Sequence, residues 1–167
     1  MPPMGNNEGI VKQVVLRAPL ERVWRAIAEA DAFGHWFGAR FDGGFEAGAR
    51  LHARIEPTAV DADVARQQQP YAGMAFDVVV ERIEPMHRFS FRWHPGGSAS
   101  GPDPSDEEMT LVEFVLEEVP QGVRLTITES GFERVPAARR EQAIADNTGG
   151  WEAQTGLIAK YLAQQDA

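Results

Sequence analysis

The chain has 167 residues, enough for one domain of ordinary size, and its lack of cysteine excludes disulfides, thiolate metal sites and cysteine nucleophiles. A net charge of -9 opposes binding to nucleic acid or to an anionic membrane. No apolar run reaches the ~18 residues of a membrane span, and the start, MPPMGNNEG, lacks the basic and apolar regions of a signal peptide. The sequence therefore predicts a cytoplasmic protein without membrane insertion.

The first part of the chain predicts one strand and two short helices. Residues 1–8 offer little apolar surface, so we expect them to be disordered, ahead of a single domain over residues 9–165. Residues 9–18 are rich in β-branched side chains that alternate with period two, which indicates an edge strand. A helix is expected from Pro19 to about residue 30, followed by a second one through Phe37 that Asp31 would cap.

Five later segments alternate apolar and polar side chains between Pro, Gly or Asp boundaries, as half-buried strands do. They are residues 49–56, 72–84, 88–94, 108–118 and 123–130. Together with the first strand they predict a curved antiparallel sheet of about six strands that is apolar on one face. Such a sheet needs a cover over that face.

Three segments predict loops rather than regular structure. Residues 59–70 and 95–107 are poor in apolar periodicity, and we expect both to be long mobile loops. The segment from Gly44 to Gly48 superficially resembles a phosphate-binding loop. It lacks the Gly-Lys-Ser/Thr ending and the strand-to-helix context, so it is interpreted as a hairpin turn.

The cover is expected from the C-terminal segment, where residues 136–164 predict the longest helix of the chain. Gly149 and Gly150 lie inside this helix and should each cost about 1 kcal/mol relative to alanine, so we expect a close backbone approach or a bend there. Its apolar stripe follows three- and four-residue steps and consists of Ile144, Thr148, Trp151, Thr155, Ile158 and Leu162, widened by Leu157 and Tyr161.

An ordered set of short motifs runs through the chain. They are Ala18-Pro19, Val23-Trp24, Phe33 with His35 and Trp36, Glu84-Pro85 with Phe89 and Trp93, Thr110 to Phe114, Glu129 to Phe132, and Gly150-Trp151. In this order they resemble the activator of heat-shock protein 90 ATPase homologue-like family, within the START-like (SRPBCC) superfamily. The resemblance implies an α+β helix-grip fold, β-α-α-β-β-β-β-β-α, in which a cavity lies between the sheet and the last helix.

The resemblance implies no particular reaction, because proteins of this shape serve as lipid or hormone carriers, cyclases, toxin-resistance proteins or co-chaperones. The leading hypothesis is a domain that binds a lipophilic or aromatic small molecule. One alternative is an activator of a chaperone ATPase, with a chaperone as its partner. Another is a cyclase- or hydrolase-like enzyme that uses the same cavity. A homodimer is a further alternative for its assembly. Neither a cofactor nor a metal is expected.

The candidate ligand-binding residues are those expected to face this cavity. The aromatic stripe of the strands belongs to the core, and in a cupped sheet the same side chains also line any space that remains. The predicted set is Trp36, Phe37, Phe76, Phe91, Trp93, Phe114, Ile127, Glu129, Trp151, Thr155 and Ile158.

Two residues are candidates for acid or base chemistry. His35 stands beside Trp36 at the expected mouth of the pocket. Glu129 alternates with Leu125 and Ile127, so it should point toward the covered face, where a carboxylate would orient a ligand. Alternatively, Glu129 is held structurally by the Trp151 indole or by a loop amide. The four histidines lack metal-ligand spacing, and no Gly-x-Ser-x-Gly elbow is present.

Overall fold

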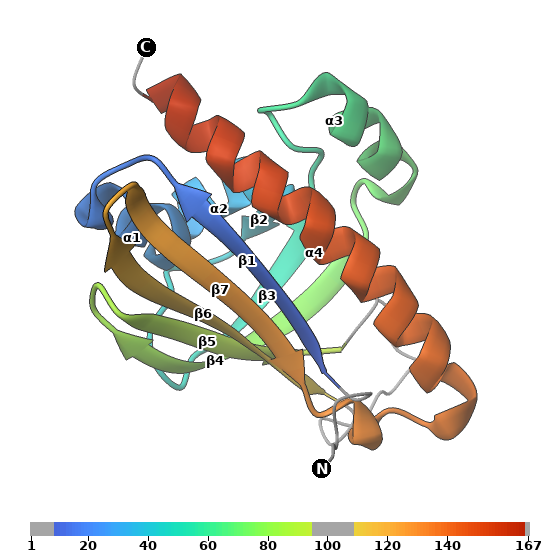
Figure 1. Cartoon of the computed structure of the whole chain (residues 1–167). Helices are drawn as coiled ribbons and strands as arrows, with labels where there is room; N and C mark the ends of the chain where they lie inside the picture. Colours follow the sequence, from blue (N-terminus) through green and yellow to red (C-terminus); the bar gives the residue numbers. More distant parts are fainter. Residues whose placement is uncertain (1–8, 95–108, 166–167) are drawn as a thin grey trace.

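The computed structural model describes residues 9–94 and 109–165. Seven strands form one antiparallel sheet in the order β1-β7-β6-β5-β4-β3-β2, and the long helix α4 lies diagonally across it (Figure 1). The strands are β1 Ile10–Leu16, β2 Ala39–Phe41, β3 Arg50–Ile55, β4 Ala75–Glu84, β5 Arg88–Trp93, β6 Thr110–Val119 and β7 Gly122–Ser130. The helices are α1 Leu20–Ala28, α2 Ala30–Phe37, α3 Ala62–Gln68 and α4 Ala137–Gln165, with short 3-10 turns at η2 Gln69–Tyr71 and η4 Phe132–Arg134. The expectations for residues 1–8 and 95–107 lie outside the described residues.

The sheet has one buried face, as the period-two alternation predicts. In β7 the side chains at alternate positions from Val123 to Glu129 are buried, and β6 repeats this pattern from Thr110 to Leu116. The two strands pair in register, with Phe114 opposite Ile127. Because successive side chains of a strand point to opposite faces, this register places the apolar set of both strands on the side that α4 covers.

Along the sequence, two short helices lie between the first strand and the other strands of the sheet, as predicted. The second one begins two residues earlier than expected, with Glu29 rather than Asp31 at the N-cap. Asp31 lies instead in the first turn, where a carboxylate is favoured by the exposed backbone N–H groups. Gly38 ends α2 in the left-handed region at φ 100°, and the chain turns there into β2.

The sheet has seven strands where the sequence predicted about six. The additional strand, β2, has only three residues, which is too short for an alternation to be recognised. It pairs antiparallel with β3, so residues 42–49 close a hairpin, as interpreted from the sequence. Strand β2 forms one edge of the sheet and β1 forms the other.

The prediction of a long loop over residues 59–70 is wrong, because these residues contain α3. The side chain of Asp61 caps this helix by accepting hydrogen bonds from the backbone N–H groups of Asp63 and Val64 at 2.9 and 3.0 Å. Lys160 of α4 forms an ion pair with Asp61 at 2.8 Å. The side-chain oxygen of Gln68 accepts from the backbone N–H of Thr58 at 2.7 Å. These contacts hold α3 against the rest of the fold.

The last helix covers the sheet with a stripe close to the predicted one. Trp151, Leu157, Ile158 and Leu162 are buried, whereas Thr155 is only partly covered and donates its hydroxyl hydrogen bond to a backbone carbonyl of its own helix. The expected close approach at the glycine pair is absent: a Cβ on either glycine would meet no atom of the described structure within 4 Å. None of the described helices combines the length and apolar character that crossing a bilayer requires.

A charged contact joins α4 to the edge of the sheet. Lys12 of β1 lies on the inward side, between the buried Ile10 and the partly buried Val14. Its ammonium group pairs with the carboxylate of Glu152 at 2.7 Å. A lysine can place its alkyl stem on apolar surface while its charged end reaches water, so this inward position is compatible with its charge.

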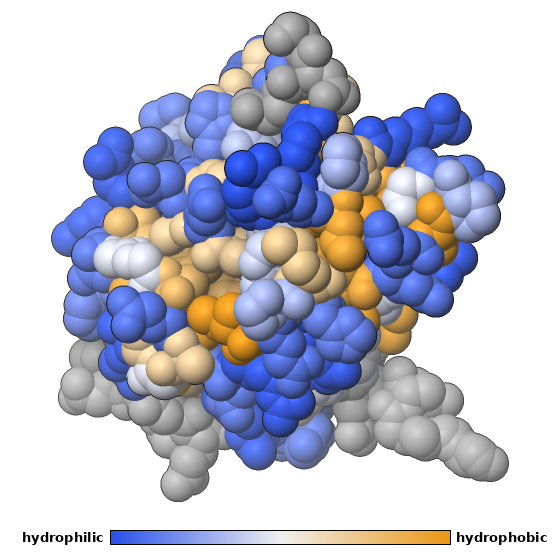
Figure 2. Space-filling model, turned by 90° about the vertical axis from the view of Figure 1, so that its left-hand side faces the viewer, coloured by the Kyte–Doolittle hydropathy of each residue, from blue (hydrophilic) through white to orange (hydrophobic). Residues whose placement is uncertain are grey.

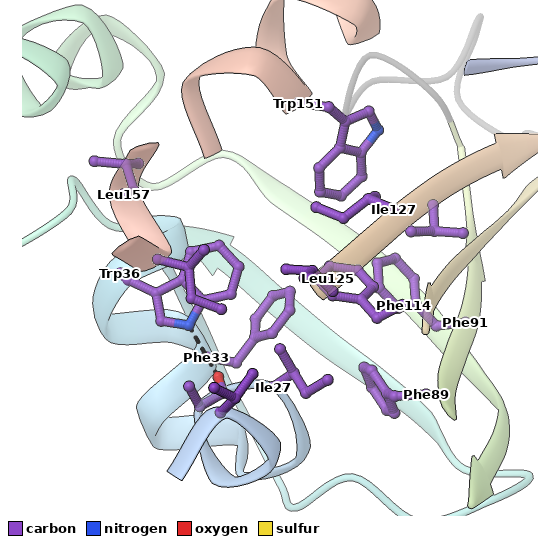
Figure 3. Packing of buried hydrophobic residues seen from close by; sticks show 14 of the residues in the cluster. Ile27, Phe33, Trp36, Phe89, Phe91, Phe114, Leu125, Ile127, Trp151 and Leu157 are labelled. Carbon is purple, nitrogen blue, oxygen red and sulfur yellow. Dashed lines mark hydrogen bonds between the residues drawn. The ribbon is translucent and has the colours of Figure 1, made fainter. Parts of the chain in front are cut away.

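The core lies between the sheet and the helices, and aromatic rings dominate it (Figure 3). Phe33 of α2 is central, with ring-centroid distances of 4.9 Å to Trp36 and 5.9 Å to Phe114. Trp36 is fully buried, and its indole N–H donates to the carbonyl of Ala26 at 2.9 Å, a bond drawn in Figure 3. This bond ties α2 to α1, since a buried indole N–H needs an acceptor.

Candidate functional site

One small apolar pocket opens among the aromatic side chains, and its volume is about 10 Å³. A space of this size holds about one water molecule. We name it the aromatic pocket. It is lined by Phe33, Phe37, Phe41, Phe45, Phe76, Val78, Phe89, Phe91 and Trp93.

Different elements bring these side chains together. Phe33 and Phe37 are four residues apart in α2, so they lie one above the other on the same helix face. Alternate positions of β4 and β5 point to the same side of the sheet and supply the opposite wall. Phe41 comes from β2, and Phe45 comes from the loop between β2 and β3. The pocket therefore lies between α2 and the β2–β5 half of the sheet.

The aromatic pocket is only partly covered. Five of its eight aromatic side chains are half-buried rather than buried: Phe37, Phe41, Phe45, Phe76 and Trp93. Partly exposed rings leave apolar surface in contact with water, at a cost of about 25 cal/mol per Å². An apolar area surrounded by hydrophilic side chains is visible on the face of the molecule that carries α1 (Figure 2).

Four of the predicted ligand-binding residues line this pocket, namely Phe37, Phe76, Phe91 and Trp93. The others lie elsewhere. Trp36, Phe114, Ile127, Trp151 and Ile158 are buried in the core and do not line the pocket. Thr155 of α4 is partly buried and does not line the pocket either.

Five lining residues were absent from the predicted set: Phe33, Phe41, Phe45, Val78 and Phe89. The alternation of β4 and β5 was the signal for two of them, since Val78 shares a face with Phe76, and Phe89 shares one with Phe91. Phe41 and Phe45 carry no such signal, because a three-residue strand and a loop have no periodicity.

Glu129 lies beside the pocket as a fully buried carboxylate. Its oxygens accept hydrogen bonds from the indole N–H groups of Trp93 and Trp151, at 2.9 and 2.8 Å. The hydroxyl of Thr110 donates at 2.5 Å, and the side-chain amide of Asn147 reaches both oxygens at 2.9 and 3.1 Å. A carboxylate has about four acceptor positions, so these donors occupy its hydrogen-bonding capacity.

The hydrogen bond from the Trp151 indole, on which the structural alternative for Glu129 depends, is present. The four donors belong to β5, β6 and α4, whereas Glu129 belongs to β7. A buried carboxylate is stable only when its oxygens are hydrogen-bonded, and here neutral donors satisfy that need. Glu129 thus joins three strands to the covering helix and fixes the orientation of Trp93 in the pocket wall. Acting on a ligand itself would require one of these bonds to break.

His35 was expected at the mouth of the pocket, but its side chain is exposed and does not line the aromatic pocket. Its ring lies 5.5 Å from that of Tyr161, centroid to centroid. Burial raises the pKa of the Tyr161 hydroxyl, and the nearby carboxylate of Glu29 acts in the same direction. His35 lines a separate open groove of about 390 Å³, together with Ala30, Asp31, Gly34, Ala39, Arg40, Phe41, Glu56, Pro57 and Ala59.

A histidine–aspartate pair lies on the outer face of the sheet. The Nδ1 atom of His52 is 2.7 Å from Asp77 Oδ1, and Arg50 donates to the other oxygen at 3.2 Å. This hydrogen bond and the charge of Asp77 raise the pKa of His52. Burial alone would raise the pKa of Asp77, but hydrogen bonds from His52 and Arg50 lower it. Within residues 9–94 and 109–165, no three His, Cys, Asp or Glu side chains are grouped to hold a metal ion.

The antiparallel sheet and the long C-terminal helix that closes it define a helix-grip, START-like domain. Residues 17–163 match the model of the family described as Activator of Hsp90 ATPase homolog 1-like protein. The chain therefore belongs to this family, as the resemblance in its sequence predicted. No match was found among curated proteins.

Several solved structures share this fold. Protein MLL2253 from Mesorhizobium loti is 22% identical, with a TM-score of 0.70 and coverage of 95% of this chain and 99% of that one. A protein encoded by gene BPP1335 of Bordetella parapertussis is 29% identical, with a TM-score of 0.63 and coverage of 93% and 75%. The Aha1 dimer from Colwellia psychrerythraea is 15% identical, with a TM-score of 0.63 and coverage of 92% and 95%.

Proposed function

We propose that the chain binds a lipophilic or aromatic small molecule in the aromatic pocket. The observation that supports this most is the lining itself, in which eight aromatic side chains and one valine converge from α2, three strands and a loop. Pockets for small molecules are predominantly lined by hydrophobic and aromatic side chains. The half-buried rings at the edge of the pocket gain further burial when an apolar molecule covers them.

Binding requires a rearrangement of the lining. Ligand pockets commonly measure about 300–1,000 Å³, far more than this one contains. The sheet side of the lining is fixed by strand pairing, since β4 pairs with both β3 and β5. The side formed by β2 and the loop that follows it lies at the edge of the sheet. Opening at this edge is therefore the least costly route to a larger pocket.

A fluorescence titration tests the proposal directly. N-phenylnaphthylamine, a neutral probe whose emission rises in apolar surroundings, should bind the native protein and raise its melting temperature by mass action. Phe76→Ala removes a ring from the pocket wall and should weaken this binding. Absence of both probe binding and a thermal shift in folded wild-type protein would contradict the proposal.

A matched control comes from an exposed apolar residue elsewhere. Val11 is 65% exposed on the outer side of β1, on a different strand and outside the pocket lining. Val11→Ser should leave probe binding unchanged, because it alters only surface hydrophobicity. A loss of binding in this variant equal to that in Phe76→Ala would indicate that the probe adsorbs nonspecifically.

A second candidate function follows from the family to which the chain belongs, whose description names an activator of the Hsp90 ATPase. In this role the chain contacts a chaperone and changes its rate of ATP hydrolysis. Adding the purified chain to such a chaperone and measuring phosphate release tests it, and an unchanged rate would speak against it. The dimeric relative from Colwellia psychrerythraea supports homodimer formation as a further proposal, which sedimentation equilibrium tests. The cytoplasmic location stays a prediction.

A further inference from the structure

We infer that Phe45 is a built-in plug of the aromatic pocket, and that the ligand presents a flat, uncharged aromatic ring that takes the place of the Phe45 ring. This inference rests on the proposed function and narrows the class of ligand. It makes Phe45 the residue that determines specificity.

The surroundings of Phe45 are those of a bound aromatic molecule. Its ring is stacked on Phe89, with centroids 4.9 Å apart and an interplanar angle of 28°. Two further rings lie nearly perpendicular to it, that of Phe41 at a centroid distance of 5.0 Å and that of Phe33 at 5.6 Å. Stacked and edge-on contacts of this kind are the preferred arrangements of aromatic pairs. The site is therefore already shaped for one planar ring.

Phe45 differs from the other lining residues in how it is held. It lies in the hairpin loop of residues 42–49, outside any helix or strand. Among residues 42–48 it is the one whose side chain is not exposed. The loop is tied at its start, where the backbone N–H of Asp42 donates to the carbonyl of His52 at 3.0 Å, and near its end, where that of Gly48 donates to Val80 at 2.9 Å. Between these ties, the inserted ring anchors the loop.

The loop can therefore withdraw its ring without breaking the sheet. Gly43 and Gly44 precede Phe45, and a Cβ on Gly44 would meet no atom of the described structure within 4 Å. Glycine lacks the steric restrictions of other residues, so this stretch has a wide choice of backbone conformations. Phe33, Phe41 and Phe89 belong to α2, β2 and β5, where a similar movement would disrupt regular hydrogen bonding.

The surface next to the plug indicates the charge of the ligand. Phe41 and Phe45 also line an open hollow of about 590 Å³ on the outside of the pocket. Glu29, Asp31 and Asp42 line the same hollow. A molecule that enters past Phe45 crosses this acidic surface, which repels anions. The pocket beyond it offers only apolar side chains, which disfavour any charged group.

Titration of four proteins with N-phenylnaphthylamine tests the inference: wild type, Phe45→Ala, Phe41→Ala and Phe76→Ala. Removing the plug should tighten binding about tenfold to a hundredfold, since the ligand no longer has to expel a buried phenyl ring. Phe41→Ala is the matched control, because it removes an equal side-chain volume from the same pocket, but at a residue that belongs to a strand rather than to the loop. It should bind no tighter than wild type, since Phe45 still fills the site.

The outcomes distinguish a failure of the plug inference from a failure of the proposed function. Equal tightening in Phe45→Ala and Phe41→Ala would show a generic cavity effect and would overturn the role of Phe45 as a plug. Unchanged or weaker binding in Phe45→Ala would overturn it as well. In both cases the proposed function still stands. No binding by either folded wild type or folded Phe45→Ala would overturn both. Should Phe45→Ala fail to fold, Phe45→Leu keeps an apolar anchor without a flat ring and is read in the same way.

A comparison of a neutral and an anionic probe tests the inferred charge of the ligand. Anilinonaphthalene sulfonate has the same rings as N-phenylnaphthylamine and adds one negative charge. We expect it to bind Phe45→Ala more weakly than the neutral probe, with a difference that shrinks as salt screens the acidic hollow. Equal affinities at low salt would overturn the preference for an uncharged ring.

Discussion

Trp151 of α4 donates its indole N–H to Glu129 of β7 at 2.8 Å, and both side chains are buried. The same carboxylate accepts the indole N–H of Trp93 at 2.9 Å, and the two indole rings lie 5.7 Å apart. Helix α4 is thus attached to the sheet at a polar point within apolar surroundings. Hydrogen bonds to a charged group in such surroundings are strong, and leaving one partner without the other is costly.

Glu129→Gln should lower the free energy of unfolding by about 1.5 to 3 kcal/mol, because the new amide turns N–H donors toward groups that are themselves donors. Urea denaturation measures this loss. Glu117→Gln is the control: that carboxylate is 64% exposed and pairs with Arg124 on the outer face. The control should change stability by less than about 0.5 kcal/mol. Equal effects in the two variants would show that the buried hydrogen bonds of Glu129 contribute little.

Trp151→Ala should destabilise the protein by about 3 to 5 kcal/mol, since it leaves a cavity next to Phe37, Trp93 and Phe114 that the sheet cannot close. Trp151→Phe retains a ring but removes the donor to Glu129, so it should lose about 1 to 3 kcal/mol. Guanidinium unfolding curves distinguish the two variants. A loss below ~1 kcal/mol in Trp151→Ala would be incompatible with the packing described for α4.

Gln68→Ala should loosen α3. The variant removes a hydrogen bond to the backbone N–H of Thr58 and another to the carbonyl of Phe37, each worth about 0.5 to 1.5 kcal/mol. Amide hydrogen exchange should therefore become faster in residues 58–68, while the strands keep their protection. Gln67→Ala, one residue earlier and exposed, is the control and should leave exchange unchanged. Equal exchange in both variants would mean that Gln68 does not hold the helix.

The His52–Asp77 pair predicts a pH dependence. The pKa of His52 is raised above 6.5 mainly by its hydrogen bond to Asp77 and by the charge of that residue, while Arg50 opposes the shift. The stabilisation is therefore complete below the unfolded value of 6.5 and is lost as pH rises through the higher folded pKa. Asp77→Asn should bring the His52 titration back toward the value of a free histidine. NMR of the imidazole protons measures both curves, and identical curves would show that the pair has no influence.

Gly149→Ala and Gly150→Ala should each stabilise the protein by about 0.5 to 1 kcal/mol, because both sites are exposed, helical and free of steric obstruction. Thermal unfolding of the single and double variants measures the gain. Gly38→Ala provides the contrast, since its φ of 100° and the nearby Gln68 side chain both oppose a Cβ, so it should destabilise. A loss of stability in the helix variants would show a requirement for glycine that packing does not explain.

Much of the fold was predictable because the strands carry period-two patterns. Phe114 and Ile127 face each other across β6 and β7, as their alternation requires. The polar helix α3 was missed because it has no buried residue and hence no apolar stripe. Its one sequence signal was Asp61, a favourable N-cap residue. The short strand β2 gave no signal at all.

The pocket was less predictable than the fold. Phe91 and Trp93 were identified because they are two residues apart on one strand and therefore share a face. The position of Phe45 depends on how a hairpin loop folds back onto Phe89, a contact across 44 residues that no local pattern encodes. Glu129 was correctly placed on the covered face, but its full set of donors comes from three separate elements. Such convergence is a property of the tertiary structure.

The inward-pointing Lys12 has a consequence for the behaviour of the molecule in concentrated solution. Strand β1 ends the sheet, and an edge strand with unpaired backbone groups can template the growth of fibrils. Pairing a further strand against β1 would crowd the ammonium group of Lys12 and take its ion pair with Glu152 out of water, at a desolvation cost that the attraction between the two charges need not repay. At the opposite edge, β2 is only three residues long. Both ends of the sheet are thus protected against amyloid-like assembly.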